Sequence, residues 1–297
     1  MIFFSIIIPA YNRAQFIEET INTALQQSYS QFEIIVVDDG STDNTKQVIG
    51  DKYRADNRVR YFYKQNEERA AARNFGLKQA KGDFAIFFDS DDWMMNHYLD
   101  TLNNLISEHP NVILLAGKYN YNNGGVKENH PTLKKLPAGW YDRQLFLQGN
   151  ILACNYCIRI KDHQYSTFPD GRELASMEDW LFLLINLEKE KIFIVDEIVL
   201  TMRQHESRSM SDNQKVINAR EKATDWALHN LSFNFSEQKI LKAWSSYFCG
   251  IHYYLDGNRG MALRKTFIAI KILGLNKKCF LLLIKSFLGR KFIKWLR

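Results

Sequence analysis

The sequence predicts an α/β fold in which a mainly parallel central sheet is flanked by helices and followed by a helical C-terminal extension. Short, nearly all-apolar runs alternate with segments of helical spacing over the first 95 residues, which is typical of strands buried on both faces of a sheet. From about residue 215 onward the pattern is helical. The 297 residues, 46% hydrophobic and 24% charged, suffice for one large domain with an extension, or for two domains.

Strand and helix alternate in the first part of the chain. Strands are expected at residues 3–8, 33–37, 59–63 and 83–88, and helices at residues 14–28, 44–55 and 67–80. Residues 41–44 can cap the second helix, and Gly82 ends the third. Polar residues directly follow three of the strands, and ligands of parallel sheets bind beyond the carboxyl ends of the strands. We therefore expect one ligand crevice at this edge of the sheet.

The second part of the chain is less regular. A helix is expected at residues 97–108, a second within residues 173–188, and an apolar strand at residues 192–202. Residues 118–139 are rich in Asn, Gly and Pro and predict a mobile loop with room for a hairpin.

The chain contains no apolar stretch of the roughly 20 residues that a bilayer span needs. Its short apolar start lacks a basic leader and reaches Pro9 quickly, which argues for a buried strand rather than a signal peptide. Four cysteines without an export signal indicate a reducing compartment. Cys154 and Cys157 form a C-x-x-C, but without a second pair at zinc spacing they are expected to be two buried thiols.

The net charge of +6 is unevenly distributed. Residues 257–297 contain eleven Lys or Arg and no acid, which leaves 28 basic and 33 acidic residues, a net charge of −5, for the first 256. The basic character therefore belongs to the C-terminal segment.

Four motifs carry the chemistry. They are SIIIPAYN (5–12), EIIVVDDGSTDNT (33–45), AARNFGLKQAKGDFAIFFDSDD (71–92) and EDW (178–180). In this order they resemble the family 2 glycosyltransferases, which are inverting, nucleotide-sugar-dependent enzymes of GT-A fold. The resemblance runs over roughly residues 3–210 and is strongest in the first 95. It implies a GT-A domain at 1–215, with a nucleotide-binding half at 1–100 and an acceptor and catalytic half at 101–215, and a basic helical extension at 216–297.

A D-x-D motif supplies the expected metal site. Moving a sugar off a nucleoside diphosphate builds negative charge on the leaving diphosphate, which Mn²⁺ or Mg²⁺ bound to oxygen ligands can offset. Asp89-Ser90-Asp91 matches this motif, and the resemblance implies Asp91 as a metal ligand. Ser90 and Asp92 are expected near the donor sugar, while Asp89 and Asp92 are also open to the ribose or to metal-bound water. His205 is either a further metal ligand or a structural histidine.

By the same resemblance, a nucleotide, expected to be UDP, is bound by residues of the first three motifs. These are Pro9, Tyr11, Asp38, Asp39, Arg73 and Asp89. Tyr11 would stack on the base, and Asp39 would accept a hydrogen bond from a uracil N–H. The alternatives are a core aromatic at a strand end for Tyr11, an Asx-turn for the two aspartates and a surface ion pair for Arg73.

Glu178-Asp179 matches the acidic pair of the family, in which the aspartate is the proposed catalytic base. A carboxylate within hydrogen-bond reach can take the proton of an attacking hydroxyl. Glu178 is expected in a supporting place near the donor sugar. The alternative is an acidic helix start favoured by the helix dipole. Arg203 and Arg208 would pair with the diphosphate or lie on a solvated loop.

The C-terminal segment interleaves Lys and Arg with apolar residues, including Phe292 and Trp295 as expected aromatic anchors. This composition predicts a basic amphipathic helix on an anionic membrane surface. The alternative is packing on the catalytic domain or on a second copy, as a homo-oligomer. Nucleic acid fits less well because the apolar content is too high. We expect a cytoplasmic protein, peripheral on the inner face of the membrane, acting on a glycan or lipid-linked acceptor in bacterial cell-surface polysaccharide synthesis.

The sequence lacks the motifs that three other classes of α/β protein would need. A D-x-D phosphatase would need threonine where Trp93 stands, a nucleotidyltransferase a Gly-rich basic loop after the first strand, and a dinucleotide-binding protein a G-x-G-x-x-G. A catalytically inactive sugar-nucleotide-binding or scaffold protein would be marked by loss of Asp91 or Asp179, and both are present.

Overall fold

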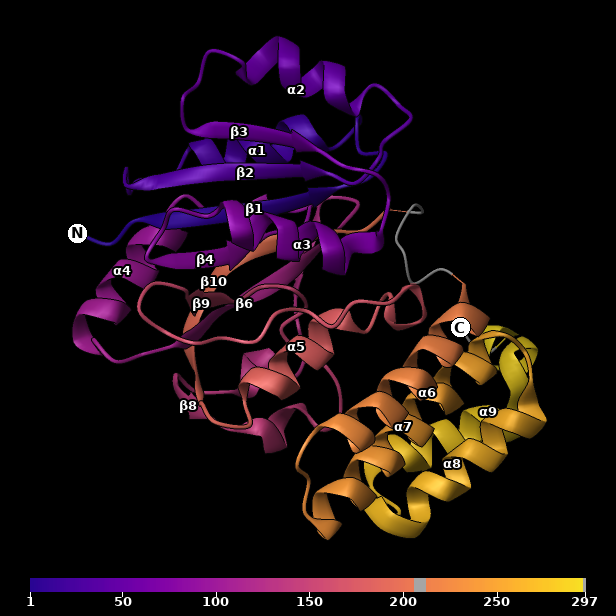
Figure 1. The fold of residues 1–297 in the computed structure, drawn as a ribbon. Coiled ribbons are helices and arrows are strands. Elements are labelled where there is room, and N and C mark those ends of the chain that lie inside the picture. The colour runs from indigo at the N-terminus through magenta and orange to yellow at the C-terminus, as the bar shows by residue number, and fades with distance from the viewer. Residues whose placement is uncertain (206–211, 296–297) are drawn as a thin grey trace. The chain divides into compact units, whose positions relative to one another are not determined.

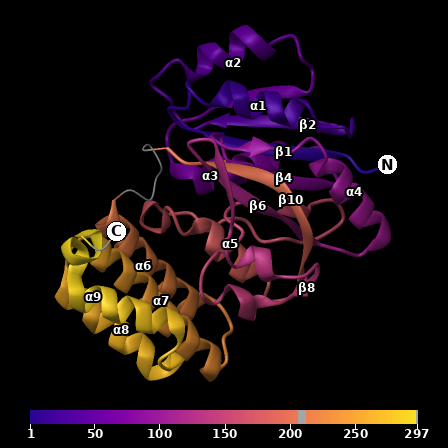
Figure 2. The same ribbon diagram turned by 180° about the vertical axis from the view of Figure 1, so that it is seen from behind.

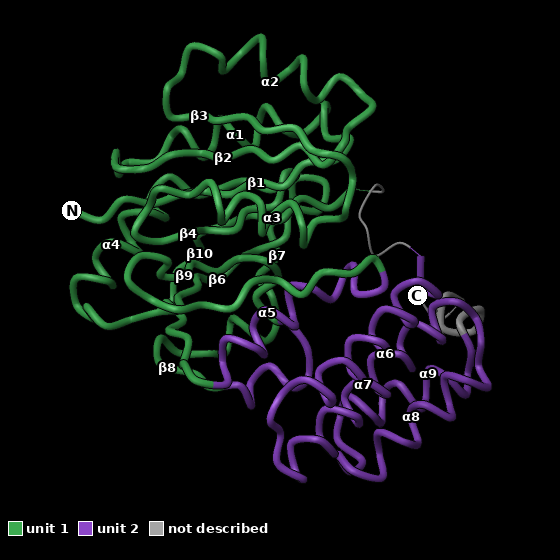
Figure 3. Tube along the Cα trace, in the orientation of Figure 1, with its two compact units in different colours: residues 1–142, 151–172, 189–205 green, residues 143–150, 173–188, 206–297 purple. Residues whose placement is uncertain are grey.

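The computed structural model describes residues 1–205 and 212–295, with side chains through residue 289. Its residues form two compact units (Figure 3). Unit 1 contains residues 1–142, 151–172 and 189–205, and unit 2 contains residues 143–150, 173–188 and 206–297. The two units therefore alternate along the chain, and two short segments before residue 189 belong with the C-terminal helices.

Unit 1 is built on one sheet (Figure 1). Among the described residues its ten strands are β1 (Phe4–Ala10), β2 (Phe32–Asp38), β3 (Val59–Tyr63), β4 (Phe84–Phe87), β5 (Trp93–Met94), β6 (Leu114–Asn123), β7 (Val126–Asn129), β8 (Gly139–Tyr141), β9 (Cys157–Arg159) and β10 (Ile192–Arg203). The order is β3-β2-β1-β4-β9-β6-β10-β5, with β7 on β6 and β8 on β10. The first four strands are parallel, as is the β6–β10 pair, whereas β9, β5, β7 and β8 pair antiparallel with their neighbours.

Four helices accompany this sheet: α1 (Ile17–Leu25), α2 (Thr45–Tyr53), α3 (Glu68–Gln79) and α4 (Tyr98–Glu108). The chain moves outward from β1 to β2 and β3 and then crosses back to β4 on the other side of β1. Right-handed crossovers place α1 and α2 on one face and α3 on the opposite face, as Figures 1 and 2 show. Gly76 lets α3 approach β1, because a Cβ there would lie 2.4 Å from a methyl of Ile7. The strand order thus reverses beside β1, which is where such sheets bind ligands.

Unit 2 is helical. It contains α5 (Glu178–Asn186), α6 (Asn213–Asn230), α7 (Phe235–Leu255), α8 (Arg259–Leu273) and α9 (Lys277–Trp295). Polar side chains mark the helix starts: Asp212 accepts from two backbone amides of α6, and Asn234 forms a capping box with Glu237 at the start of α7. Helix α8 ends at Gly274, whose φ of 70° favours glycine. Buried side chains of α7, α8 and α9 form its apolar core, among them Tyr254, Ala262 and Leu282.

The predicted fold class is confirmed, with parallel character concentrated in the first four strands. One prediction is wrong: residues 118–123 are not loop but the second half of β6, a strand inside the sheet. Its buried polar residues broke the apolar pattern that marks a strand, and Lys118 is accommodated by an ion pair with Asp196. The hairpin expected beyond it is present as β6 and β7.

Cys154 and Cys157 are buried thiols that form no disulfide, as expected. No helix in the described part of the chain is long and apolar enough to cross a membrane. Phe292, Trp295 and Arg208, to which the sequence assigned roles, lie outside the described side chains.

Candidate active site

The loops after β1, β2 and β4 meet at one edge of the unit 1 sheet. Because these strands are parallel neighbours, their carboxyl ends lie side by side. Asn12, which follows β1 with a φ of 52°, joins two of the loops: its side-chain oxygen accepts from the amide of Thr42 at 2.8 Å, and its own amide donates to the Ser41 hydroxyl at 2.9 Å. Tyr11 beside it remains 47% exposed, so its ring is accessible to a ligand. Pro9 is buried within β1.

The two aspartates after β2 have different surroundings. Asp38 is fully buried and accepts from the Tyr61 hydroxyl at 2.7 Å and from the Ser41 amide at 2.8 Å. Burial and the Asp38 carboxylate raise the pKa of Tyr61. The contacts of Asp38 match the structural alternative, a turn stabilised by an aspartate.

Asp39 faces the loop after β3. It accepts from the Lys64 ammonium at 2.8 Å and from the Glu67 amide at 3.1 Å. Burial lowers the pKa of Lys64, but hydrogen bonds to Asp39 and Glu67 outweigh it, and the net shift is upward. The cation that Asp39 needs is therefore supplied by the protein itself.

Arg73 is a buried residue of α3 rather than a surface one. It is 1% exposed, and its guanidinium donates to Asp89 Oδ1 at 2.8 Å. The guanidinium carbon lies 5.3 Å from the centre of the Phe168 ring. The pair joins α3 to the D-x-D loop, so both predicted nucleotide-binding residues lie at the same place.

Asp91 is the centre of a charged cluster. Its Oδ2 lies 3.0 Å from His205 Nε2 and 3.6 Å from Arg13 Nε. The His205 ring is tilted against Phe16, with centroids 4.4 Å apart. Neither His205 Nδ1 nor Arg13 Nε, both buried, has a hydrogen-bond partner among the described residues. Asp92 is also buried and accepts from the backbone amide of Arg203 at 3.1 Å, which connects the D-x-D loop to the end of β10.

Arg203 ties the end of β10 to α1. Its guanidinium donates to Glu19 Oε2 at 2.5 Å and to the Phe16 carbonyl at 3.3 Å, and it lies near the Phe16 and Trp93 rings. Burial lowers its pKa, although Glu19 and the aspartates oppose that shift. These contacts position His205, two residues further on, beside Asp91.

The donor set fits a hard divalent cation. Two ligand atoms bound at about 2.1 Å and at right angles are about 3 Å apart. Asp91 Oδ2 and His205 Nε2 have that separation. The described residues contain no group of three or more His, Cys, Asp or Glu that could hold a metal. Such a cation would therefore take its other ligands from phosphate oxygens and water, as Mg²⁺ commonly does.

Glu178 and Asp179 belong to unit 2, whereas the other predicted site residues belong to unit 1. They form the first turn of α5, where the helix dipole favours acidic side chains. Glu178 is buried, and Asp179 accepts from the Trp180 amide at 2.8 Å and from Asn150 Nδ2 at 2.7 Å.

Three residues that contact predicted site residues were not themselves predicted. They are Arg13, which contacts Asp91, Lys64, which contacts Asp39, and Asn150, which contacts Asp179. Arg13 directly follows Tyr11 and Asn12, and its position after the first strand was the available signal. Lys64 and Asn150 stand in stretches without a motif, and only their contacts reveal them.

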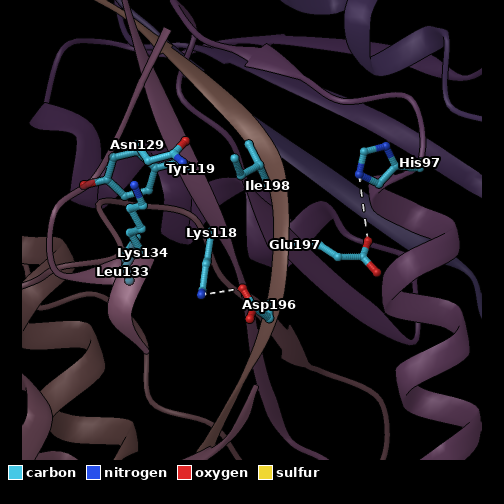
Figure 4. A pocket seen from close by; sticks show the side chains of 9 residues that line it. All are labelled: His97, Lys118, Tyr119, Asn129, Leu133, Lys134, Asp196, Glu197 and Ile198. Carbon is cyan, nitrogen blue, oxygen red and sulfur yellow. Dashed lines mark hydrogen bonds and ion pairs between the residues drawn. The ribbon is translucent and has the colours of Figure 1, made fainter. Parts of the chain in front are cut away.

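A separate cavity of about 380 Å³ lies further back along β10 (Figure 4). It is lined by His97, Lys118, Tyr119, Asn129, Leu133, Lys134, Asp196, Glu197 and Ile198. Lys118 is buried there and donates to Asp196 at 2.5 Å. Ile198 pairs with Lys118 in the sheet, seven residues before His205, so this cavity is distinct from the strand-end site.

A parallel sheet with Tyr11, Asp39, Arg73 and a D-x-D near the carboxyl ends of its strands is typical of the nucleotide-sugar transferases. The model of the family "Glycosyl transferase family 2" matches residues 5–162. The chain belongs to this family.

Curated proteins that are similar in sequence are also glycosyltransferases by name. The chain is 36% identical over 118 residues to glycosyltransferase GlyG of Streptococcus pneumoniae, which is 39% of each chain. It is 33% identical over 192 residues to an uncharacterized glycosyltransferase of Haemophilus influenzae, covering 63% of this chain and 72% of that protein. The match thus spans well under half of GlyG and most of the Haemophilus protein.

Solved structures share the GT-A fold. Residues 1–349 of Staphylococcus aureus TarS with UDP-GlcNAc superpose with a TM-score of 0.67 at 22% identity, covering 98% of this chain and 88% of that one. The mannosyltransferase PcManGT of Pyrobaculum calidifontis with GDP-Man and Mn²⁺ gives 0.64 at 15% identity, covering 98% and 82%. At these identities the likeness establishes the fold.

Proposed function

We propose that this protein transfers a sugar, with inversion, from a nucleoside diphosphate sugar to a hydroxyl of a glycan or lipid-linked acceptor in bacterial cell-surface polysaccharide synthesis. The observation that carries the proposal is the cluster at Asp91, where a carboxylate and the imidazole of His205 lie 3.0 Å apart beside the nucleotide-binding residues. The presence of UDP-GlcNAc in the TarS structure supports UDP as the carrier.

The residues of unit 1 bind the nucleotide. The exposed ring of Tyr11 stacks on the base, and Asp39, oriented by Lys64, accepts a base N–H. Arg73 and Asp89, already paired, face the ribose and phosphate side. Tight binding of the carrier orients the sugar for attack.

Asp91 and His205 would hold Mn²⁺ or Mg²⁺ together with diphosphate oxygens. The bound ion offsets the negative charge that develops on the leaving diphosphate. Mn²⁺ in the PcManGT structure is consistent with this assignment. Ser90 and Asp92 belong to the same loop, and we propose that they support the donor-sugar region from their buried positions.

Asp179 is the proposed general base. It takes the proton from the acceptor hydroxyl, whose oxygen attacks the anomeric carbon on the side opposite the diphosphate. The bond to the diphosphate oxygen breaks in the same step, so no covalent enzyme intermediate forms. Glu178 supports this turn of α5 from its buried position.

A donor screen tests the proposal. Release of nucleotide from UDP- and GDP-sugars is measured with Mn²⁺, with and without lipid-linked and free glycan acceptors. We expect acceptor-dependent release from a UDP-sugar. Nucleotide binding without turnover would support an inactive sugar-nucleotide-binding protein instead. Neither binding nor release with any donor would overturn the enzyme assignment.

We further propose that α8 and α9 bind an anionic membrane surface. Apolar residues of α9 form a stripe at helical spacing that is exposed rather than buried: Phe280, Leu281, Ile284, Phe287 and Leu288. The segment around it contains eleven basic residues and no acid. A second copy would bring the same positive charge, whereas anionic lipids supply the opposite one.

Liposome sedimentation tests this surface. Replacing Phe280 and Phe287 together with Ser should reduce binding to vesicles containing anionic lipid about tenfold or more, since each ring contributes about 1.5–3 kcal/mol when buried. Phe235→Ser is the matched control, because Phe235 is exposed at the start of α7, outside the stripe. Equal binding by the double variant, or concentration-dependent dimerisation without lipid binding, would refute the membrane assignment.

A further inference from the structure

The carboxylate of Asp179 is held from both sides within unit 2. Its Oδ1 accepts from the Trp180 amide of its own helical turn at 2.8 Å. Its Oδ2 accepts from the side-chain amide of Asn150 at 2.7 Å. Because both oxygens accept a hydrogen bond, rotation of the carboxylate is restricted, and the donor to Oδ2 comes from a different part of the chain.

That donor stands at the end of a segment that unit 2 anchors repeatedly. In this segment, residues 143–150, the carbonyl of Phe146 accepts from the Trp180 indole N–H at 2.8 Å. The carbonyl of Gln148 accepts from the Arg220 guanidinium at 3.2 Å. Helix α5 and helix α6 therefore each anchor the segment a few residues before Asn150.

Arg220 occupies an unusual place for a guanidinium. It is 1% exposed, and its central carbon lies 3.6 Å from the centre of the Trp180 ring. Burial lowers its pKa to about 9, opposed by nearby groups that include the Asp179 carboxylate. Beside this cation the segment contains Gly149, whose φ of 144° is a backbone conformation that favours glycine. A buried cation stacked behind the tryptophan thus fixes the segment from the side of α6.

We propose that Asn150 is a positioning residue for the base Asp179, and that Arg220 holds the segment that presents it. The donated hydrogen bond fixes the orientation of the carboxylate that takes the acceptor proton. It also favours the ionised carboxylate, the form that accepts a proton. Among the described residues, Arg220 from α6 is a charged group that interacts with Asp179, and Glu178 precedes Asp179 in the sequence. This inference rests on the proposed role of Asp179.

Asn150→Ala tests the inference in the full-length protein. A hydrogen bond to a charged group is worth about 1.5–3 kcal/mol, which predicts a fall in kcat of about 10- to 100-fold. The KM for the sugar nucleotide should change less than about twofold, because the donor site is in unit 1. The acidic limb of the pH–rate profile should move to higher pH, because a carboxylate that loses a donor binds its proton more tightly. Asn150→Asp, which replaces the donor by a second carboxylate, should be at least as impaired.

The matched control is Gln148→Ala. It removes an amide side chain of the same segment that contacts Lys278 rather than Asp179, and it should retain wild-type kcat and pH profile. Asp179→Asn separates the two levels of the proposal. If Asp179→Asn keeps transferring sugar, the base assignment fails. If Asp179→Asn is inactive and Asn150→Ala shows wild-type kcat and an unmoved acidic limb, the positioning role fails while the base stands.

A purely structural role for Asn150 has its own signature. It would lower the melting temperature and reduce kcat with the acidic limb unmoved, and that result would also overturn the inference. The double variant Asn150→Ala with Asp179→Asn should be no slower than Asp179→Asn alone, because residues that act through one group are not additive. An additional loss would place Asn150 in a different function.

Discussion

At Asp91 one carboxylate oxygen faces both an imidazole and a guanidinium, 3.0 Å and 3.6 Å away. The histidine is separated from it by 114 residues in the sequence. A second aspartate at the same edge of the sheet, Asp39, has as its partner Lys64, which comes from another loop. The two aspartates therefore have different surroundings: Asp39 is paired with a lysine, whereas Asp91 lies beside a histidine and an arginine, and only Asp91 is proposed to hold a divalent cation.

For Asp91→Asn we expect a loss of Mn²⁺-dependent transfer of at least about 100-fold, because an amide is a poor ligand for a hard cation. Titrating UDP with and without Mn²⁺ gives a second readout: the metal should no longer strengthen UDP binding. Asp56→Asn serves as the control, since Asp56 forms an ion pair with Arg58 in the loop between α2 and β3, which precedes a strand instead of following one. Retention of Mn²⁺-dependent turnover by Asp91→Asn would refute the assignment.

Lys64→Met tests the role of Asp39. It leaves a buried carboxylate without its cation, and a hydrogen bond between charged groups contributes about 1.5–3 kcal/mol. We expect UDP to bind about tenfold more weakly or worse, measured by calorimetry. Lys52→Met, which removes an exposed lysine of α2 paired with Glu18, should bind UDP normally. Equal affinity in both variants would mean that Lys64 does not orient Asp39 for the base.

At the scale of the elements, the strand ends and the helix starts carry the chemistry. The loops after β1 and β2 share hydrogen bonds, Arg13 and Asp91 form an ion pair between the loops after β1 and β4, and His205, directly after β10, reaches Asp91 at the same edge. In unit 2 the first turn of α5 presents Asp179, while α6 and α7 are joined by a hydrogen bond of 2.8 Å between Asn213 and His252.

His252 makes the helices of unit 2 sensitive to acid. Burial lowers its pKa below the ordinary value of 6.5. The unfolded chain therefore binds a proton at higher pH than the folded one, so the contribution of neutral His252 to the free energy of unfolding is present above pH 6.5 and is lost as the pH falls below it. One proton limits the slope to about 1.4 kcal/mol per pH unit.

Denaturant unfolding at pH 7.5 and 5.0 measures this effect. His252→Gln keeps an amide for Asn213 but does not titrate, so it should lose less stability between the two pH values than the wild type. His229→Gln, at an exposed histidine of α6, should behave like the wild type. An unchanged pH dependence in His252→Gln would show that this histidine is not the acid-sensitive group.

At the scale of the whole molecule, the sequence suggests a division at residue 215, with residues 216–297 as a separable extension. The contacts favour a different grouping, because α5 and residues 143–150 pack with α6 and α7. Arg143 pairs with Glu237 at 3.0 Å, and Arg220 stacks on Trp180. The helices after residue 215 thus complete the surroundings of Asp179.

We therefore expect a chain ending at residue 215 to lose cooperative thermal unfolding and to aggregate, because Trp180 and the segment 143–150 lose their covering. A chain ending at residue 256 retains Arg220 and Glu237 and should keep a folded circular dichroism spectrum. Both are compared by thermal melting and gel filtration. A monomeric 1–215 fragment that melts cooperatively near the temperature of the full chain would support the division predicted from sequence.

Much of the fold could be predicted because its signals are local. The strand at residues 59–63 was located to the residue, and the other three predicted strands and the three predicted helices before residue 89 were located within a few positions, whereas the two-residue strand β5 was not predicted. Apolar runs, caps and glycines act over neighbouring residues, so they can be read in order. Strand β6 was not predicted because its buried Lys118 and Asn120 break the apolar pattern of a strand. The partners that stabilise Lys118 come from other segments of the chain.

The sequence by itself determined the α/β architecture and the polar residues that follow its parallel strands. Only the tertiary structure decided which groups face one another: His205 rather than another acid beside Asp91, Lys64 on Asp39, and Asn150 on Asp179. The physical reason is range. Local backbone preferences depend on adjacent residues, whereas the partner of a carboxylate depends on which distant loops the sheet and the helices bring within about 3 Å.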